Sequence, residues 1–410
     1  MSFHQPIHVA IACGGTGGHL FPGLAVGRAL RRRGARVTLL ISPKEVDQQA
    51  VRGVSDLQVA SLPAVGLQGG NHLGFGWAFC RSFLAARALF SRATPEIVLA
   101  MGGFTSAPPI LAGRTSGAAT ALHESNTIPG RANRILSRVV STAFVGFAET
   151  VCRFPEVRAE VTGTPVRESF SVRDPGNARQ ALGLAADRPV LSILGGSQGA
   201  SGLNEVVKGA LPALARRWPG LQFIHLAGPR DVAALQAAYA SAGLQAVVLA
   251  FSDRVDEILA ASTVAVARSG ASTLAEFAAM ALPSILVPLP TAVDDHQRHN
   301  AEAFVRVGAA RCLAQRDAQP RVLVDLLGDL LDGGPAHESM SEAAGRLHRP
   351  DAADRIADRL LSLASGPFGV RAESPARVRR EEPPVRRVTL PVGGTFSAKP
   401  LGSREPVNTP

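Results

Sequence analysis

A glycine-rich loop between an apolar strand and a helix occurs twice in this chain of 410 residues. The first strand is expected at residues 8–12, and its loop reads Gly-Gly-Thr-Gly-Gly-His at 14–19. The second strand is expected at 190–194, and its loop reads Gly-Gly-Ser-Gln-Gly at 195–199. A strand, a glycine loop and a helix in this order are typical of the first unit of a nucleotide-binding α/β domain. The repeat therefore predicts two such domains in tandem.

Other short apolar runs alternate with helical stretches, which predicts parallel sheets joined by crossover helices. Strands are expected at 37–41, 97–100, 119–122 and 142–145 in the first domain, and at 223–227, 246–250, 264–267 and 284–287 in the second. The predicted fold class is α/β, with two doubly wound parallel sheets that face each other across a cleft. Ligands of open α/β sheets bind beyond the carboxyl ends of the strands, so the cleft is the expected site.

The domain boundaries follow from changes in composition along the chain. The first domain is expected at 1–163, a polar linker at 164–189 and the second domain at 190–350. A C-terminal helix is expected at 351–365, returning to the first domain. Residues 366–410 are rich in proline and arginine without an apolar period, which predicts a disordered tail.

Charge and cysteine content narrow the class of protein. The chain has 43 Lys and Arg against 33 Asp and Glu, so we expect anionic partners. Its four cysteines are scattered singly, which is atypical of zinc sites or disulfide scaffolds and favours a reducing compartment. We expect neither a leader peptide nor a membrane span. The sequence shows no segment in which aromatic and basic residues are interleaved, the pattern that would indicate nucleic acid as a partner.

The first glycine loop precedes a helix that we expect to begin at Pro22. The helix N-terminus favours an anion by roughly 0.3–1 kcal/mol, so a phosphate or a developing charge could lie there. The loop does not match the dinucleotide fingerprint, because Leu20 and Ser42 stand where a small and an acidic residue are needed. The alternative is a tight turn for packing. His19 at the helix mouth favours a functional site.

A third loop reads Arg-Ser-Gly-Ala-Ser-Thr at 268–273, and Glu276 follows one helical turn later. Small residues let a diphosphate approach the backbone, and a carboxylate can accept both hydroxyl groups of a ribose. A helix-capping arrangement explains the same residues equally well.

Polar residues follow two other strands, at 123–126 (His-Glu-Ser-Asn) and at 294–297 (Asp-Asp-His-Gln). We interpret the first set as a functional site, because four consecutive polar groups are hard to attribute to packing, and the second set as groups that bind sugar hydroxyls. A solvated loop is the alternative at 123–126, and a metal site is the less favoured alternative at 294–297.

A helical segment at 77–92 places Phe79, Phe83, Ala86 and Phe90 on one face, with arginines opposite. Packing on its own sheet is the first interpretation. An interfacial membrane role is the alternative, because this chain has few aromatic residues and gathers several of them here.

Taken in order, these motifs resemble one family, the MurG-type glycosyltransferases that convert lipid I to lipid II. The resemblance covers residues 7–363. Its motifs are 14–19 with Pro22, 101–103, 123–126 with 129–130, 163–167, 195–200, 268–276, and Asp295 with Gln297 and 300–301. Each motif is weak alone, and their ordered sum is specific.

The resemblance implies a GT-B architecture, and it implies transfer of N-acetylglucosamine, with inversion, from UDP-N-acetylglucosamine to the 4-hydroxyl of the N-acetylmuramoyl group of lipid I. It implies no cofactor and no bound metal. It assigns donor or acceptor binding to Thr16, Gly17, Gly18, Asn126, Arg167, Ser197, Ser252, Ala271, Ser272, Thr273, Leu274, Ala275, Glu276 and Gln297. His19 is the expected base, and Glu124 is expected on the acceptor side. Ser125, Phe104 and Thr291 depart from the family pattern.

The resemblance also predicts a peripheral protein on the cytoplasmic face of the bacterial inner membrane. An anionic membrane surface and proteins of cell-wall synthesis or division are the further partners it implies. An NAD-linked oxidoreductase, a nucleic-acid-binding scaffold, other GT-B transferases and UDP-sugar epimerases are the alternatives that the sequence leaves open.

Overall fold

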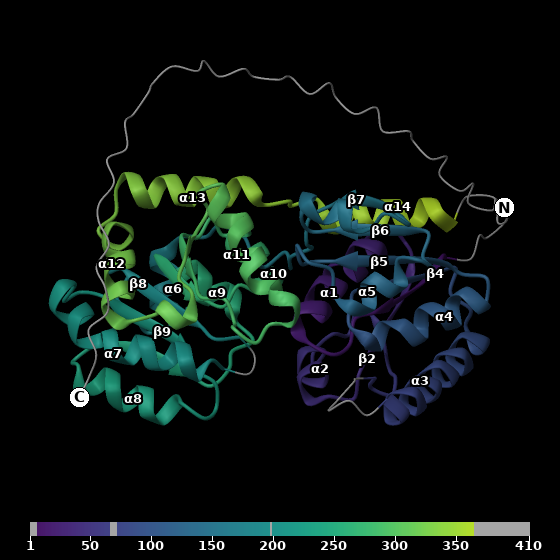
Figure 1. The fold of residues 1–410 in the computed structure, drawn as a ribbon, viewed down its shortest axis with the longest axis horizontal. Helices are drawn as coiled ribbons and strands as arrows, with labels where there is room; N and C mark the ends of the chain where they lie inside the picture. The colour runs from purple at the N-terminus through teal and green to yellow at the C-terminus, as the bar shows by residue number, and fades with distance from the viewer. Residues whose placement is uncertain (1–5, 66–71, 197–198, 365–410) are drawn as a thin grey trace, which may run out of the picture. The chain divides into compact units, whose positions relative to one another are not determined.

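The structure is a computed structural model, which describes residues 6–65, 72–196 and 199–364. All of these belong to one compact unit that contains two parallel sheets, one in each half of the chain (Figure 1). Ser197 and the tail expected at 366–410 lie outside the described residues. The two-sheet α/β class is confirmed.

The first sheet has seven parallel strands in the order β3-β2-β1-β4-β5-β6-β7. Their bounds are β1 His8–Ala12, β2 Arg36–Ile41, β3 Gln58–Ser61, β4 Ile97–Ala100, β5 Ala119–Glu124, β6 Thr142–Val145 and β7 Arg158–Val161. The strand order reverses beside β1, so the loop after β1 opens at the topological switch point. The edge strands β3 and β7 are partly exposed and were not predicted, because they lack an apolar run.

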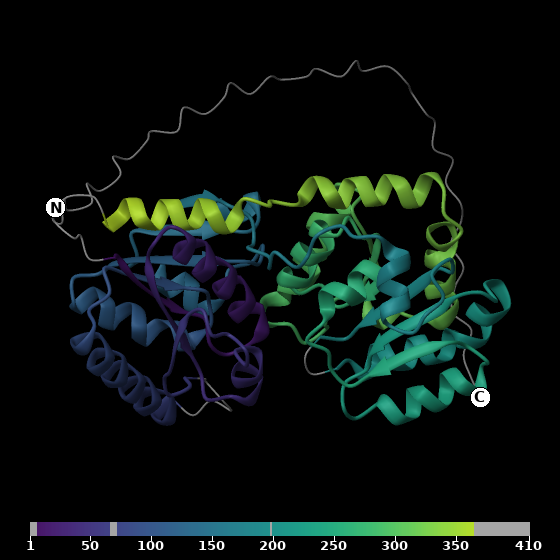
Figure 2. The same cartoon turned by 180° about the vertical axis from the view of Figure 1, so that it is seen from behind.

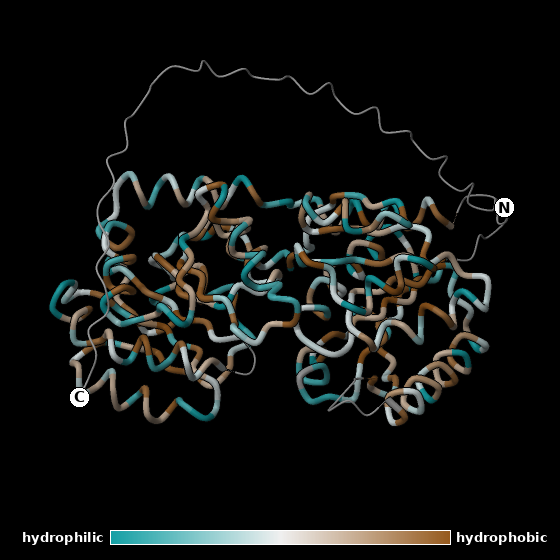
Figure 3. The backbone as a smooth tube through the Cα atoms, in the orientation of Figure 1, coloured by the Kyte–Doolittle hydropathy of each residue, from teal (hydrophilic) through white to brown (hydrophobic). Residues whose placement is uncertain are grey.

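The second sheet has six parallel strands in the order β10-β9-β8-β11-β12-β13. Their bounds are β8 Val190–Leu194, β9 Gln222–Leu226, β10 Ala246–Leu249, β11 Val264–Ala267, β12 Ser284–Leu286 and β13 Arg311–Cys312. Here the loops after β8 and β11 open at the switch point. Hydrophobic residues follow the strands through the interior of each half (Figure 3).

Helices cover the two sheets. Their bounds are α1 Gly17–Arg32, α2 Glu45–Ala50, α3 His72–Arg92, α4 Ala107–Thr115, α5 Arg131–Leu136, α6 Pro175–Ala181, α7 Ser201–Arg217, α8 Val232–Ser241, α9 Val255–Ala261, α10 Ala271–Ala279, α11 His296–Arg306, α12 Pro320–Leu331, α13 Pro335–Leu347 and α14 Ala352–Ala364. Short 3-10 helices are η1 Phe104–Ser106, η2 Ala148–Arg153, η3 Val293–Asp295 and η4 Gln315–Asp317.

The prediction that Pro22 begins the first helix is wrong, since α1 begins at Gly17 and contains Pro22. A proline nitrogen cannot donate to the carbonyl four residues earlier, which here is that of Gly18. The freed Gly18 oxygen instead accepts a hydrogen bond of 3.0 Å from Ser272 Oγ at the start of α10. This earlier start places His19 in the first turn of α1.

Helix α14 packs against α1, far away in the sequence (Figure 2). Ile356, Ala357 and Leu360 are buried in the same core cluster as residues of β1 and α1. At its exposed edge, Arg33 forms ion pairs with Asp354 (2.5 Å) and Asp358 (2.6 Å). The last described helix is therefore part of the N-terminal half.

Candidate functional site

The first glycine loop is held tightly at the carboxyl end of β1. Gly14 lies so close to β2 that a Cβ there would be 2.8 Å from the carbonyl carbon of Ile41. Its carbonyl accepts a hydrogen bond of 2.6 Å from Thr105 Oγ1, and the Gly15 amide donates to Asp47 Oδ2 at 2.7 Å. These hydrogen bonds fix the position of the loop, and thereby the position of the first turn of α1.

His19 projects from that turn onto a second pair of glycines. Gly102 and Gly103 follow β4 with φ of 116° and 75°, and a Cβ at Gly102 would lie 2.8 Å from His19 Nε2. His19 Nδ1 lies 3.3 Å from Thr16 Oγ1. Burial lowers the pKa of His19, although the carboxylates of Glu124 and Asp47 act in the opposite direction. The imidazole is therefore neutral at neutral pH and can accept a proton.

Glu124 ends β5 and organises the loop that follows. Its Oε1 accepts from the Asn126 backbone N and Nδ2, both at 2.9 Å, and its Oε2 accepts from Gly130 N and Asn133 Nδ2, also at 2.9 Å. Four donors from its own half thus occupy a carboxylate that is only 4% exposed. This geometry favours loop positioning by Glu124.

Asn300, in α11, joins the loop after β5 to the loop after β11. Its Oδ1 accepts from Thr127 N at 2.9 Å and from Thr127 Oγ1 at 3.0 Å. Its Nδ2 lies 3.0 Å from Asn126 Oδ1 and 3.2 Å from Ser269 O, and donates to both. The side chain is completely buried. Asn300 therefore connects the loop after β5, which the sequence analysis assigned to the acceptor, with the loop after β11, which it assigned to the donor.

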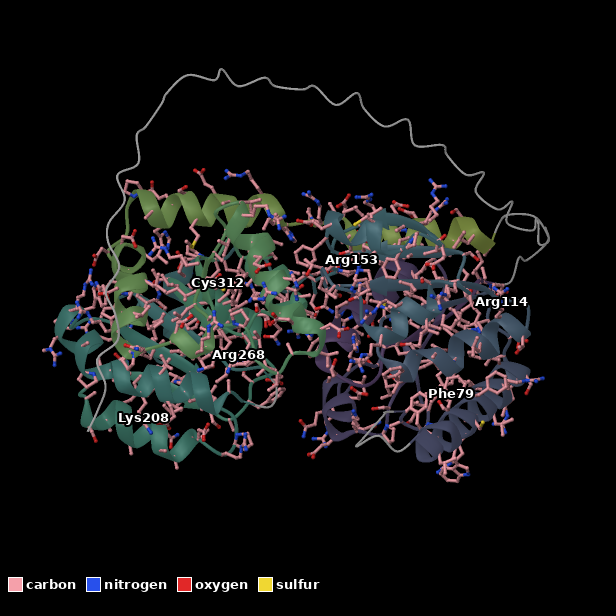
Figure 4. All side chains as sticks on the ribbon, viewed as in Figure 1. Phe79, Arg114, Arg153, Lys208, Arg268 and Cys312 are labelled. Carbon is pink, nitrogen blue, oxygen red and sulfur yellow. The ribbon has the colours of Figure 1, made fainter. Side chains whose placement is uncertain are left out.

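The loop after β11 leads into α10, whose N-cap is Gly270. Arg268 is buried and donates to the carbonyls of Val287 and Pro288, at 2.9 and 3.2 Å, inside the C-terminal half (Figure 4). Ala271 and Leu274 are buried in the helix, so contact with a ligand is left to their backbone. The partly exposed residues of this stretch are Ser272, Thr273, Ala275 and Glu276. The unpaired amides of a first helical turn favour a negatively charged group.

Glu276 lies one turn into α10, where burial raises the pKa of its carboxyl to about 7. Arg167 acts in the opposite direction, and Asp256 raises the pKa further. The Arg167 guanidinium lies 4.5 Å from the ring centre of Phe21 and 4.9 Å from that of Phe170. Its buried Nε has no hydrogen-bond partner in the described structure. The structure thus places Glu276 and Arg167 in one electrostatic environment.

Gln297 is anchored beside the same loop. Its Oε1 accepts from Leu289 N at 3.0 Å, and its backbone carbonyl accepts from Ser269 Oγ at 2.8 Å. Among the described residues, its Nε2 has no hydrogen-bond partner and so remains a donor for a ligand. Ser252 accepts a hydrogen bond of 3.1 Å from Arg254 N in the loop after β10.

The acidic pair near Gln297 forms ion pairs with arginines. Asp294 pairs with Arg134 and lies 3.8 Å from Arg131 Nη2, and Asp295 pairs with Arg298. Within residues 6–65, 72–196 and 199–364, no three His, Cys, Asp or Glu side chains gather to hold a metal ion. Both carboxylates are thereby committed to cations of the protein.

Sequence reasoning missed Asp47 and Thr105, and it quoted Asn300 only as part of a motif. Asp47 lies on a short helix between Pro43 and Gly53, which mark the helix but not the role of this side chain, and it bonds to a residue 32 positions earlier. Thr105 bonds across 91 positions. Only their proximity in space reveals these contacts.

Helix α3 has a buried face and an exposed apolar face. Ala86 and Phe90 are buried in the sheet core and Phe83 packs against it, as the helical period predicted. On the other side Leu73, Trp77 and Leu84 are 90%, 63% and 63% exposed. The Arg81 guanidinium lies 4.5 Å from the Trp77 ring centre. In the described part of the chain, no helix has the length and apolar character needed to span a bilayer.

Comparisons with known proteins bear on both halves. Residues 9–145 match the glycosyltransferase family 28 N-terminal domain, and residues 190–356 match the family 28 C-terminal domain. The chain is 39% identical, over 367 residues, to a protein from Halorhodospira halophila named UDP-N-acetylglucosamine–N-acetylmuramyl-(pentapeptide) pyrophosphoryl-undecaprenol N-acetylglucosamine transferase. That match covers 87% of this chain and 99% of the relative.

Solved structures show the same fold. MurG of Acinetobacter baumannii superposes with a TM-score of 0.67 at 29% identity, covering 87% of this chain and all of that one. A UDP-N-acetylglucosamine 2-epimerase of Listeria monocytogenes superposes with a TM-score of 0.64 at 16% identity, covering 87% of this chain and 96% of that one. At that low identity the second likeness concerns the fold alone.

Proposed function

The chain belongs to glycosyltransferase family 28 and, within it, to the MurG family, and we infer that it transfers N-acetylglucosamine from UDP-N-acetylglucosamine to lipid I, forming lipid II. The observation that carries this inference is the 39% identity to a relative that the match covers almost entirely. The relative's name selects the transferase over the oxidoreductase and epimerase alternatives. The protein is a UDP-N-acetylglucosamine-dependent glycosyltransferase of GT-B architecture.

The C-terminal half carries the groups suited to the donor. The first turn of α10 offers amides to the diphosphate, and Glu276 offers a carboxylate to the ribose hydroxyls. Arg167 supplies positive charge near Glu276. The Nε2 of Gln297, which has no hydrogen-bond partner among the described residues, is suited to donate to a sugar hydroxyl. Ser252 and the undescribed Ser197 are further donor-binding residues in this proposal.

The N-terminal half carries the groups suited to the acceptor. In the proposed single displacement, the neutral imidazole of His19 takes the proton of the attacking 4-hydroxyl. The new bond forms at C1 of N-acetylglucosamine, and the electron pair of the breaking C1–O bond leaves with UDP. Thr16, Gly17, Gly18 and Asn126 face the sugars, and Glu124 acts by holding Asn126 in place. General-base assistance of this kind contributes about 10²–10⁴ in rate.

We further propose that the protein acts on an anionic membrane surface, at the cytoplasmic face of the inner membrane. Leu73, Trp77 and Leu84 form the exposed apolar face of α3, and Ile135 on α5 is 59% exposed. Exposed apolar residues flanked by arginines suit the interface of a bilayer that carries anionic lipids. Proteins of cell-wall synthesis or division remain proposed partners, supported only by the family resemblance.

One assay tests the activity directly. Incubation with UDP-N-acetylglucosamine and a soluble lipid I analogue should yield the disaccharide product and UDP, with and without a chelator. A parallel incubation without acceptor controls for epimerisation of the donor. Formation of UDP-N-acetylmannosamine, or no sugar transfer by a folded preparation, would contradict the proposed function.

A further inference from the structure

Asp47 lies in α2, beside the first glycine loop, and its side chain is completely buried. Its Oδ2 accepts three hydrogen bonds, from Gly15 N at 2.7 Å, from Ser42 N at 3.1 Å and from Ser42 Oγ at 2.5 Å. Its Oδ1 is also buried and has no hydrogen-bond partner among the described residues. The loop thus carries a carboxylate of the protein's own at its base.

That carboxylate accepts a hydrogen bond from a backbone amide, that of Gly15, which a glycine loop normally offers to a ligand. Loops of this kind bind phosphate through backbone amides beside a helix N-terminus. Here the amide of Gly15 already donates to a carboxylate in a buried site. A second anion at the same amide would meet like-charge repulsion, which is strong where water is excluded.

We propose that Asp47 is a positioning residue, which serves as the anion bound by the first glycine loop. By holding this loop, Asp47 orients His19 toward a neutral sugar hydroxyl. The same contact keeps diphosphate groups away from the Gly15 amide. The diphosphate of the lipid acceptor is therefore bound elsewhere than at this amide. This inference deepens the proposed function and rests on it.

Asp47 acts on the proposed reaction through the pKa of His19, as the charges around this residue show. Glu124 and His123 face His19 from β5, Asp47 faces it from α2, and Lys44 faces it from the residue before α2. Burial lowers the pKa of His19. The charges of Glu124 and Asp47 raise this pKa, and the charge of Lys44 lowers it. Removing the Asp47 charge alone therefore leaves the imidazole a weaker base.

The test compares Asp47→Asn and Asp47→Ala with the parent protein, and Glu45→Gln is the matched control. Glu45 is exposed in the same helix and, among the described residues, accepts a hydrogen bond from Gln49 alone, so its substitution removes an equal charge away from the loop. Asp47→Asn keeps the size of the side chain and an oxygen for the Gly15 amide. UDP-N-acetylglucosamine affinity should be unchanged in every variant, which verifies folding.

The first readout is the pH profile of kcat with a soluble lipid I analogue. The acidic limb of Asp47→Asn should move to lower pH, because the imidazole has lost a negative neighbour. Asp47→Ala should lose about tenfold to a hundredfold in kcat, since the Gly15 amide and Ser42 then lack an acceptor. Glu45→Gln should reproduce the parent profile.

The second readout is inhibition by inorganic pyrophosphate at varied acceptor concentration. Pyrophosphate should inhibit Asp47→Asn at least about threefold more strongly than the parent, because the repelling charge is gone. A parent-like acidic limb together with parent-like pyrophosphate inhibition in Asp47→Asn would overturn the inference, whatever happens to Asp47→Ala. If the parent protein itself transfers no sugar, the proposed function fails instead.

Discussion

Because the proposed function assigns Glu276 to the ribose of the donor, its raised pKa should make donor binding depend on pH in a calculable way. Its carboxyl group has a pKa of about 7 because it is buried and because Asp256 is near. Only the ionised carboxylate accepts hydrogen bonds from both ribose hydroxyls. If binding requires that form, the apparent Kd is multiplied by one plus the ratio of protonated to ionised enzyme.

This factor is about 11 at pH 6, about 2 at pH 7 and about 1.1 at pH 8, so the Kd of the donor should fall about tenfold from pH 6 to pH 8. That change corresponds to about 1.4 kcal/mol. The diphosphate diester of the donor stays ionised throughout this range and adds no slope of its own. Isothermal titration calorimetry of UDP-N-acetylglucosamine over this range measures the effect.

Two variants separate the carboxyl group from other causes. Glu276→Gln should bind the donor more weakly and without the pH slope, because the amide does not titrate. Asp256→Asn should move the transition to lower pH, because the Asp256 charge raises the pKa of Glu276. A donor Kd that stays constant from pH 6 to pH 8 in the parent protein, or an unchanged slope in Glu276→Gln, would refute the reasoning.

Three further predictions concern other parts of the structure. His19→Ala should lower kcat by about 10²–10⁴ with an unchanged donor Kd, and parent-like turnover would remove His19 from the mechanism. Asn300→Ala should lower stability by about 3 kcal/mol, since it leaves buried groups of both loops unpaired; an unchanged melting temperature would contradict the bridging role. Replacing Trp77 and Leu84 together by alanine should weaken co-sedimentation with anionic vesicles more than tenfold, while the exposed but remote Val307→Ala should not; equal losses would refute the membrane face.

The buried strands could be predicted because their residues are apolar on both faces. The expected and observed bounds agree for β1, β4, β8 and β11, and each of these strands is completely buried. A parallel strand covered by helices on both sides needs a continuous apolar run, which the sequence displays directly. The edge strands β3, β7 and β13 are partly exposed and carry polar residues, so no such run marked them.

The start of α1 shows where a local rule was not sufficient. Proline is favoured at the beginning of helices, which led to a predicted start at Pro22. In the structure the helix extends five residues further back, and the carbonyl that Pro22 leaves free is satisfied by Ser272 Oγ. The compensating donor lies 254 positions away in sequence, so no window around Pro22 contained it.

The residue types of the glycine-rich loops can be read from the sequence alone. Glycines at 14–15 and 102–103 are needed where a Cβ would collide with backbone or with His19, or where φ is positive. Glu276 is likewise placed one turn into its helix by spacing. The positive φ at Gly15, Gly102 and Gly103 and the spacing of Glu276 are local properties. The close contacts at Gly14 and Gly102 are with Ile41 and His19, which lie far away in the sequence, so only the folded chain shows them.

The role of each polar group was decided by the tertiary structure. Glu124 and Asp47 are both acidic residues near a loop, and only the folded chain shows that backbone amides occupy the oxygens of Glu124 and Oδ2 of Asp47. Asn300 became a bridge because Thr127, 173 positions earlier, lies 2.9 Å away. Hydrogen bonds and charge interactions depend on distance in space, which the order of residues does not contain.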